Sequence, residues 1–182
     1  MRKIFFTIGL VGMLVSCGYP NKNQGAETVV ETKEETKVIG KAFKSKVPTY
    51  DYAGLKPFLE NENDSTYVVN FWATWCKPCV KELPAFEKLN AEFSNKKLKV
   101  LLVSMDFPSK LEKFVIPFLD RNNIQSQVIL FNDPDANNWI PSIDKTWSGA
   151  IPATIIYNKN KNTFYERSFT YEELKTEVES IL

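Results

Sequence analysis

Cys76 and Cys79 lie in the stretch FWATWCKPCVKELP (residues 71–84), separated by two residues. Two thiols at this spacing can bind a metal, form a structural disulfide, or exchange disulfides with other thiols. A zinc site needs three or four nitrogen or sulfur ligands, but the 182-residue chain has no histidine and only one further cysteine, Cys17. A bridge across two residues closes too small a loop to stabilise a fold strongly. The sequence therefore favours redox exchange over metal binding or a structural disulfide.

The flanking segments predict that the pair lies where a strand gives way to a helix. YVVNFWA, just before it, is rich in β-branched and aromatic residues, as buried strands are. The segment after it predicts an amphipathic helix, because apolar residues recur at spacings of three and four: Val80, Leu83, Phe86, Leu89 and Phe93. A helix start offers unpaired N–H groups and a favourable dipole, and both stabilise a thiolate, the attacking species.

The residues around the pair fit this chemistry. Lys77 adds a positive charge beside Cys76, and Pro78 lacks only an N–H that a first helical turn leaves unpaired. Cys79, one turn further on, is expected to be more buried and to resolve a mixed disulfide. Trp75 is expected to be an exposed active-site aromatic, against the alternative of a core residue.

FWATWCKPC followed by KELP resembles the thioredoxin superfamily, and within it the TlpA/ResA-like branch of membrane-anchored thioredoxins, over residues 64–182. The resemblance implies an α/β, thioredoxin-like fold, in which helices flank a central mixed β-sheet that carries a TlpA/ResA-type insert. It implies a redox-active Cys76–Cys79 disulfide with Cys76 as nucleophile and Cys79 as resolving thiol, and no cofactor. It also implies protein disulfides as substrates and a membrane thiol electron donor as partner.

Two prolines extend the resemblance. In the family, the bond corresponding to Ile151–Pro152 is cis and lies against the dithiol, and the residue before the proline offers backbone hydrogen bonds to a substrate. From the sequence alone, a proline before a strand (here Ala153–Tyr157) is usually trans. Pro84 matches a proline that kinks the active-site helix in this family.

Glu82 is a candidate proton acceptor. Many thioredoxins have a buried Asp beneath the dithiol, but this chain has Asn70 there, which cannot accept the proton of Cys79. Glu82 follows Cys79 by three residues, on the same helix face, and matches an acid typical of the ResA-like branch. A carboxyl buried near thiols would have a raised pKa and could accept the proton. The alternative is an ordinary acid favoured by the dipole of the first helical turn.

One segment departs from the family pattern. Many relatives have a glycine-containing loop after the last hairpin, and this loop lines the substrate groove. The corresponding stretch here, RSFTYEELK, has Phe169 and no glycine. The shape of the groove, and with it the choice of partner, is therefore expected to differ.

The N-terminus predicts export and lipid anchoring. Residues 1–16 combine a basic start with an apolar stretch too short to span a bilayer, as in a signal peptide. LVSC, ending at Cys17, resembles the bacterial lipobox, whose cysteine becomes lipidated; the alternative is a plain signal peptide. Residues 17–46 read as a flexible tether and 47–182 as one domain. These features predict a lipoprotein of the bacterial cell envelope that faces the periplasm or extracytoplasmic space.

The remaining periodicities complete an α/β pattern. They predict a short helix within 52–63, strands within 97–107, 126–133 and 163–168, a helix over 109–123 kinked at Pro117, a loop or irregular helix over 136–147, and a closing helix over 171–182. The insert of ResA-like proteins would correspond to 127–147.

Charge and motifs exclude other classes. Without the two basic residues of the signal, 21 Lys and Arg face 22 Asp and Glu, with no basic run for nucleic acid. There is no Gly-rich phosphate loop and no histidine to activate a nucleophile. The leading hypothesis is a monomeric reductase of protein disulfides. A disulfide oxidase or isomerase, or a non-catalytic peptide-binding protein, remains the alternative.

Overall fold

The computed structural model describes residues 47–182. The predicted signal peptide, the lipidation site Cys17 and the predicted tether therefore lie outside the described residues. No helix within the described part is long and apolar enough to cross a membrane.

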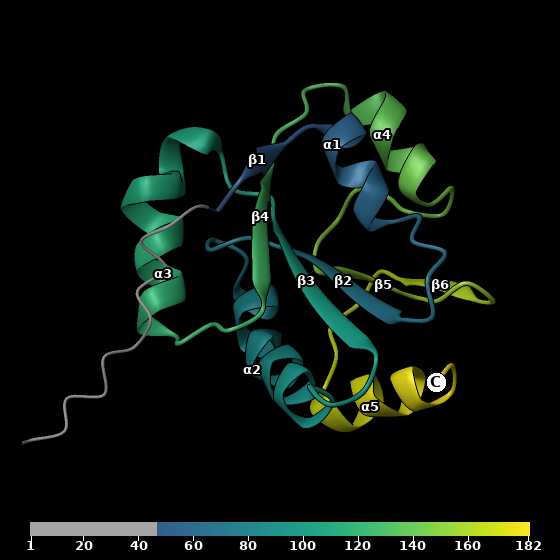
Figure 1. The fold of residues 1–182 in the computed structure, drawn as a ribbon. Coiled ribbons are helices and arrows are strands. Elements are labelled where there is room, and N and C mark those ends of the chain that lie inside the picture. Colours follow the sequence, from purple (N-terminus) through teal and green to yellow (C-terminus); the bar gives the residue numbers. More distant parts are fainter. Residues whose placement is uncertain (1–46) are drawn as a thin grey trace, which may run out of the picture. The chain divides into compact units, whose positions relative to one another are not determined.

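A six-stranded mixed sheet forms the centre of the domain (Figure 1). Its spatial order is β1-β4-β3-β2-β5-β6, where β1 to β4 are parallel to one another, β5 runs antiparallel to β2, and β6 runs antiparallel to β5. The strands are β1 (Thr49–Tyr50), β2 (Thr66–Trp72), β3 (Leu98–Ser104), β4 (Gln127–Phe131), β5 (Ala153–Tyr157) and β6 (Asn162–Tyr165). The predicted fold class is confirmed.

Helices cover both faces of the sheet. One face packs on α2 (Lys77–Glu92), α3 (Ile116–Arg121) and α5 (Tyr171–Glu179), and the other on α1 (Tyr52–Leu55) and α4 (Ala136–Ile143). Alternate residues of β2 face opposite cores, as the pleat requires. Val68 and Trp72 point toward α2, whereas Val69 and Phe71 face the aromatic cluster around Trp139. Asn70 is thus a polar residue on the α2 side of the central strand.

The stretch expected to form one kinked helix is divided into three. A 3-10 turn (Pro108–Lys110) and a π-helical turn (Leu111–Val115) precede α3. Pro117 lies in the first turn of α3, where its missing N–H is tolerated. One regular helix over this stretch would place Phe114 on the same apolar face as Val115 and Phe118, but the π turn shifts the helical phase and Phe114 is 43% exposed.

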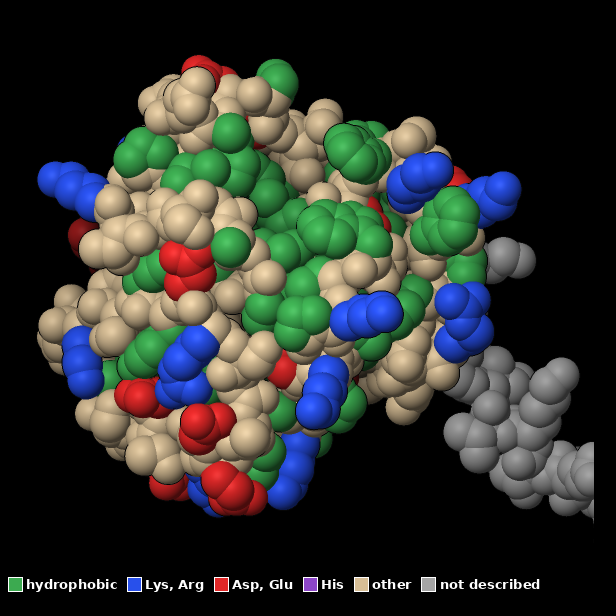
Figure 2. Space-filling model, turned by 180° about the vertical axis from the view of Figure 1, so that it is seen from behind, with side chains coloured by type: hydrophobic (Ala, Val, Ile, Leu, Met, Phe, Trp, Pro, Cys, Tyr) green, Lys and Arg blue, Asp and Glu red, His purple; other side chains and the backbone are tan. Residues whose placement is uncertain are grey.

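Smaller differences concern the ends of elements. β6 ends at Tyr165, three residues earlier than expected, and residues 136–143 form a regular helix, α4. The two-residue β1 was not predicted. It pairs with β4 at the sheet edge and is too short to show a pattern. The space-filling view in Figure 2 shows the opposite side of the domain, where hydrophobic side chains gather at the middle of the face.

Candidate functional site

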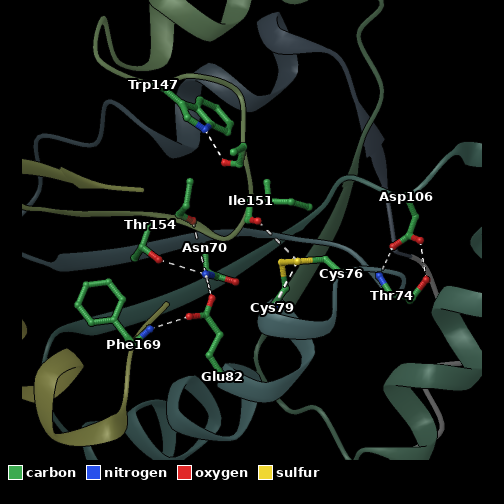
Figure 3. Close-up of a disulfide and its surroundings, with 12 residues drawn as sticks. Asn70, Thr74, Cys76, Cys79, Glu82, Asp106, Trp147, Ile151, Thr154 and Phe169 are labelled. Atoms are coloured by element: carbon green, nitrogen blue, oxygen red, sulfur yellow. Dashed lines mark hydrogen bonds between the residues drawn. A yellow bond between two sulfur atoms is a disulfide. The ribbon is translucent and has the colours of Figure 1, made fainter. Parts of the chain in front are cut away.

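The two cysteines lie at the start of α2, just beyond the carboxyl end of β2, as predicted. They form a disulfide with a Cα–Cα distance of 5.3 Å (Figure 3). Cys76 is the N-cap of α2 and has extended backbone, and the Cys79 N–H donates to Cys76 Sγ at 3.3 Å. The sulfur of Cys76 therefore takes the capping role that an Asp or Ser oxygen usually fills. The Cys79 N–H, which has no carbonyl partner within the helix, points at Cys76 Sγ, the atom that carries the negative charge of the thiolate.

The exposures follow the predicted division of roles. Cys79 is fully buried, whereas Cys76 keeps a small exposed fraction of 6%. Trp75 is 63% exposed, so it is not a core residue. Lys77 and Pro78 are exposed at the first two positions of α2.

The loop before β5 closes over the disulfide. The Ile151–Pro152 bond is cis, as the resemblance implied, and the Ile151 carbonyl oxygen lies 3.7 Å from Cys76 Sγ. Ile151 is half-buried and Pro152 buried. The peptide before β5 therefore lies directly against the first cysteine.

Hydrogen bonds that were not predicted from the sequence hold this loop in place. Trp147 Nε1 donates to the Ala150 carbonyl at 2.8 Å. The Glu166 carboxylate accepts from the backbone N–H groups of Ser148 (3.1 Å) and Ala150 (3.3 Å), and from the Ser148 hydroxyl. The hydrogen bond from the Ser148 hydroxyl contributes most to holding the pKa of Glu166 below its usual value, and the two backbone N–H groups add to this effect. The acid directly after β6 thus fixes the loop that carries Ile151.

Glu82 is buried, at 3% exposure, beneath the dithiol. Its carboxylate accepts from Asn70 Nδ2 at 2.9 Å and from the Phe169 backbone N–H at 2.8 Å. Burial raises the pKa of Glu82 to about 7, while the two hydrogen bonds and the charge of Arg167 oppose the shift. The expected raised pKa is confirmed, and a group of this pKa can gain or lose a proton at neutral pH.

Asn70 orients Glu82 instead of replacing it. Asn70 Nδ2 also lies 3.1 Å from Thr154 Oγ1, on the directly paired residue of β5. The other amide atom, Oδ1, is buried and has no hydrogen-bond partner among the described residues. Figure 3 shows Asn70, Thr154 and Glu82 as one polar group between the sheet and α2.

Phe169, in the segment that departs from the family pattern, lies beside the active site. Its side chain is buried, packs edge-on against Tyr165 and lies 4.0 Å from the Arg167 guanidinium. It lines a cleft of about 410 Å³ between the start of α2 and the chain before α5. The cleft extends to Glu82, so the residue at 169 shapes the approach to the buried acid.

A second unpredicted contact ties the two loops beside the dithiol together. Asp106 is buried and accepts from the Thr74 N–H (2.9 Å), the Thr74 hydroxyl (2.6 Å) and the Ser104 hydroxyl (2.9 Å). Asp106 follows β3 by two residues and Thr74 follows β2 by two. Their position at the carboxyl ends of neighbouring parallel strands is the signal that could have revealed the pair.

Comparison with known proteins agrees with this geometry. Residues 41–163, more than half of the chain, match the AhpC/TSA family. The chain belongs to the AhpC/TSA family.

Individual relatives are similar to part of the chain or to nearly all of it. The thioredoxin-like protein YneN of Bacillus subtilis (strain 168) is 38% identical over 78 residues, which are 43% of this chain and 45% of YneN. The thiol-disulfide oxidoreductase ResA of Geobacillus thermodenitrificans (strain NG80-2) is 24% identical over 186 residues, 99% of this chain and 96% of that protein.

Solved structures confirm the fold of this AhpC/TSA-family chain. The crystal structure of a DsbF homologue from Corynebacterium diphtheriae superposes with a TM-score of 0.55 at 19% identity, and covers 70% of this chain and 76% of that one. The predicted thioredoxin-like family and fold are thus confirmed. The match to YneN spans less than half of either protein.

Proposed function

We propose that this protein is a thiol–disulfide oxidoreductase that reduces protein disulfides through Cys76 and Cys79. One observation carries the proposal: Cys76 Sγ accepts the Cys79 N–H at the start of α2 while the carbonyl of Ile151 lies against it. A structural disulfide needs neither contact. The relatives named thiol-disulfide oxidoreductases support the same chemistry.

In the proposed cycle, the Cys76 thiolate attacks a substrate disulfide, forms a mixed disulfide and releases one substrate thiolate. Cys79 then loses its proton to Glu82 and attacks Cys76 Sγ. The substrate leaves with both sulfurs reduced, and the Cys76–Cys79 disulfide remains. A substrate backbone beside the cis-proline loop would hydrogen-bond at Ile151, and Trp75 would contact it from the other side.

The reducing direction has support in the contacts of Cys76. A strongly oxidising dithiol needs a reduced form with an unusually stable thiolate. In the described residues, one backbone N–H lies within hydrogen-bond distance of Cys76 Sγ, and neighbouring Lys77 is exposed to screening solvent. The chain also has no histidine to pair with the thiolate.

Location and partners complete the proposal. The LVSC sequence at Cys17 supports a lipid-anchored, extracytoplasmic protein whose dithiol a membrane thiol donor keeps reduced. The oxidising compartment makes such a donor necessary, because thiols there do not stay reduced unaided. We propose that the protein works as a monomer.

Insulin reduction by dithiothreitol tests the activity. The protein should accelerate it, and Cys76→Ser should abolish the acceleration. Cys79→Ser should instead accumulate a mixed disulfide at Cys76, because attack still occurs but resolution does not. Equal activity of wild type and Cys76→Ser would exclude the proposed function and favour a non-catalytic peptide-binding protein.

A further inference from the structure

Three exposed aromatic side chains lie in the segments that follow β2 and β3, the two strands whose ends lie beside the dithiol. Trp75, Phe107 and Phe114 are 63%, 71% and 43% exposed. Among residues 47–182, only Leu182 at the C-terminus joins them as an exposed large hydrophobic side chain. Three of four such residues thus lie in the loops and the π turn that follow β2 and β3. Single exposed apolar residues need no explanation, but a group of aromatics beside a reactive cysteine indicates an interaction site.

The contacts between these loops place the aromatics together. The hydrogen bonds between Thr74 and Asp106 join the residue before Trp75 to the residue before Phe107. The Phe107 carbonyl accepts the Lys110 N–H at 2.8 Å, which leads the chain directly into the turn that carries Phe114. Beneath this segment, Phe118 packs on Trp72 of β2 with ring centroids 5.3 Å apart. The group is therefore held by buried contacts.

Lysines surround the aromatics. The Nζ atoms of Lys110 and Lys113 lie 5.2 and 5.7 Å from the centroid of the Phe114 ring. Lys77 and Lys81 are exposed on the first two turns of α2, next to Cys76. Figure 2 shows, on one side of the domain, a hydrophobic area with Lys or Arg side chains along its right and lower sides.

The charge of this face is opposite to that of the rest of the domain. Residues 47–182 carry 15 Lys and Arg against 18 Asp and Glu, a net charge of −3. The segments 75–81 and 107–114, which form this face, hold four lysines and one acid, Glu112, and give it a charge of +3. Glu82 and Asp106 lie next to these segments but are buried, and they are counted with the remainder. The remainder, 11 basic against 17 acidic residues, carries −6. Such separation steers partners by charge and raises association rates.

We propose that this face docks an acidic segment of a partner protein, with an apolar side chain beside the cysteine that enters exchange with Cys76. The docking face is Trp75, Lys77, Lys81, Phe107, Lys110, Phe114 and Lys113. The proposal rests on the proposed function and adds the chemistry of its substrate. Acidic side chains meet the lysines, and the apolar side chain packs against the exposed aromatic rings.

Other occupants fit the charges less well. A second copy would present the same +3 face and be repelled in a symmetric, face-to-face dimer. Residues 18–46 carry six lysines and four glutamates, so they too are net positive. An anionic lipid surface would match the lysines and aromatics, but it would cover the only exposed part of the disulfide, Cys76.

Exchange with two peptides of equal length tests the proposal. Each holds one cysteine linked to thionitrobenzoate and one phenylalanine. One peptide has glutamates at the positions where the other has lysines. The Cys76 thiolate bonds to the peptide sulfur as the old S–S bond breaks, and the coloured thionitrobenzoate anion leaves. The full-length chain is used in detergent with Cys17→Ser, so that Cys76 and Cys79 are its only thiols.

At low salt, the acidic peptide should react about tenfold faster than the basic one, and about 1 M salt should remove most of the difference. Lys110→Glu/Lys113→Glu should remove or reverse the preference, while exchange with a small uncharged disulfide stays unchanged. Phe114→Ala should slow both peptides. The matched control is Lys96→Glu/Lys161→Glu, which makes the same change in charge beyond the other end of α2 and in the β5–β6 turn, and should keep the preference.

Equal rates for the two peptides, or an equal loss of preference in the control, would overturn the docking proposal. Binding of the oxidised protein to anionic vesicles that Lys110→Glu/Lys113→Glu abolishes, together with equal peptide rates, would assign the face to lipid instead. If the protein fails with the small disulfide as well, the proposed function fails. If only the peptide preference is missing, docking alone is wrong.

Discussion

The Glu82 side chain makes the stability of this domain depend on pH. Its pKa of about 7 in the folded protein exceeds the ordinary value of 4.5. Between these values the folded protein holds a proton that the unfolded chain has lost. The contribution of Glu82 to the free energy of unfolding therefore falls as pH rises through this range, by about 3 kcal/mol in all.

Glu82→Gln should remove this dependence, because Gln does not titrate. The free energy of unfolding of the oxidised wild type, minus that of the variant, should decrease from pH 4.5 to 7 in denaturant titrations. Resolution of the mixed disulfide by Cys79 should slow in the variant, while the first attack by Cys76 changes less. The exposed acid Glu62, changed to Gln, is the control. A flat difference, or unchanged resolution in stopped-flow measurements, would show that Glu82 does not act as the base.

Asn70→Ala should raise the pKa of Glu82 further. The substitution removes the Nδ2 donor 2.9 Å from Oε1, one of the contacts that lower this pKa. The midpoint of the pH dependence of resolution should move to higher pH. The same substitution in a Glu82→Gln background should leave the profile where it was. A midpoint that moves downward or stays fixed in the single variant would contradict the proposed role of Asn70.

At the scale of elements, Glu166, the acid directly after β6, holds the loop before β5 by hydrogen bonds. Glu166→Gln leaves one acceptor oxygen for the donors of Ser148 and Ala150. Hydrogen exchange at these two amides should accelerate at least about tenfold, since bonds to a charged group stabilise by about 1.5–3 kcal/mol. Because the pKa of Glu166 is lowered, acid should loosen the wild-type loop in the same way. Unchanged exchange would show that Trp147 alone holds the loop; Glu62→Gln again serves as control.

Elements with a strong local pattern could be predicted from the sequence. β2, α2 and β5 were, because β-branched runs and a three-to-four spacing specify them directly. Cys76, Cys79 and Glu82 were identified because they lie at the start of α2 at spacings of three residues, and because this pattern resembles the ResA-like branch. The π turn before α3 was not foreseen, since the apolar residues of 111–119 fit a regular helix equally well.

The support of the site depends on long-range contacts that no local pattern records. Glu166 and Ser148 are 18 residues apart, and Asn70 and Thr154 are 84 apart. Their pairing follows from strand order and register, which the sequence alone did not fix. Asp106 and Thr74 meet for the same reason. Each of these side chains taken alone looks like an ordinary polar residue of a loop or strand.

At the scale of the whole molecule, the proposed lipid anchor at Cys17 would decide where the dithiol works. Cys17→Ser should abolish incorporation of labelled fatty acid and move the protein out of the membrane fraction, because the acceptor thiol is gone. The activity of the purified protein on insulin should remain, since the dithiol is untouched. Unchanged labelling and fractionation would contradict lipid anchoring and leave residues 1–16 as a plain signal peptide.

In the proposed function, Cys76 and Cys79 form a dithiol that gives electrons to protein disulfides. The most direct measurement is its reduction potential, obtained by equilibrating the full-length Cys17→Ser chain with dithiothreitol or glutathione buffers and counting alkylated thiols by mass. The modest stabilisation of the Cys76 thiolate predicts a value near that of thioredoxin, about −270 mV. A value near −120 mV would mark a disulfide oxidase and contradict the proposed direction.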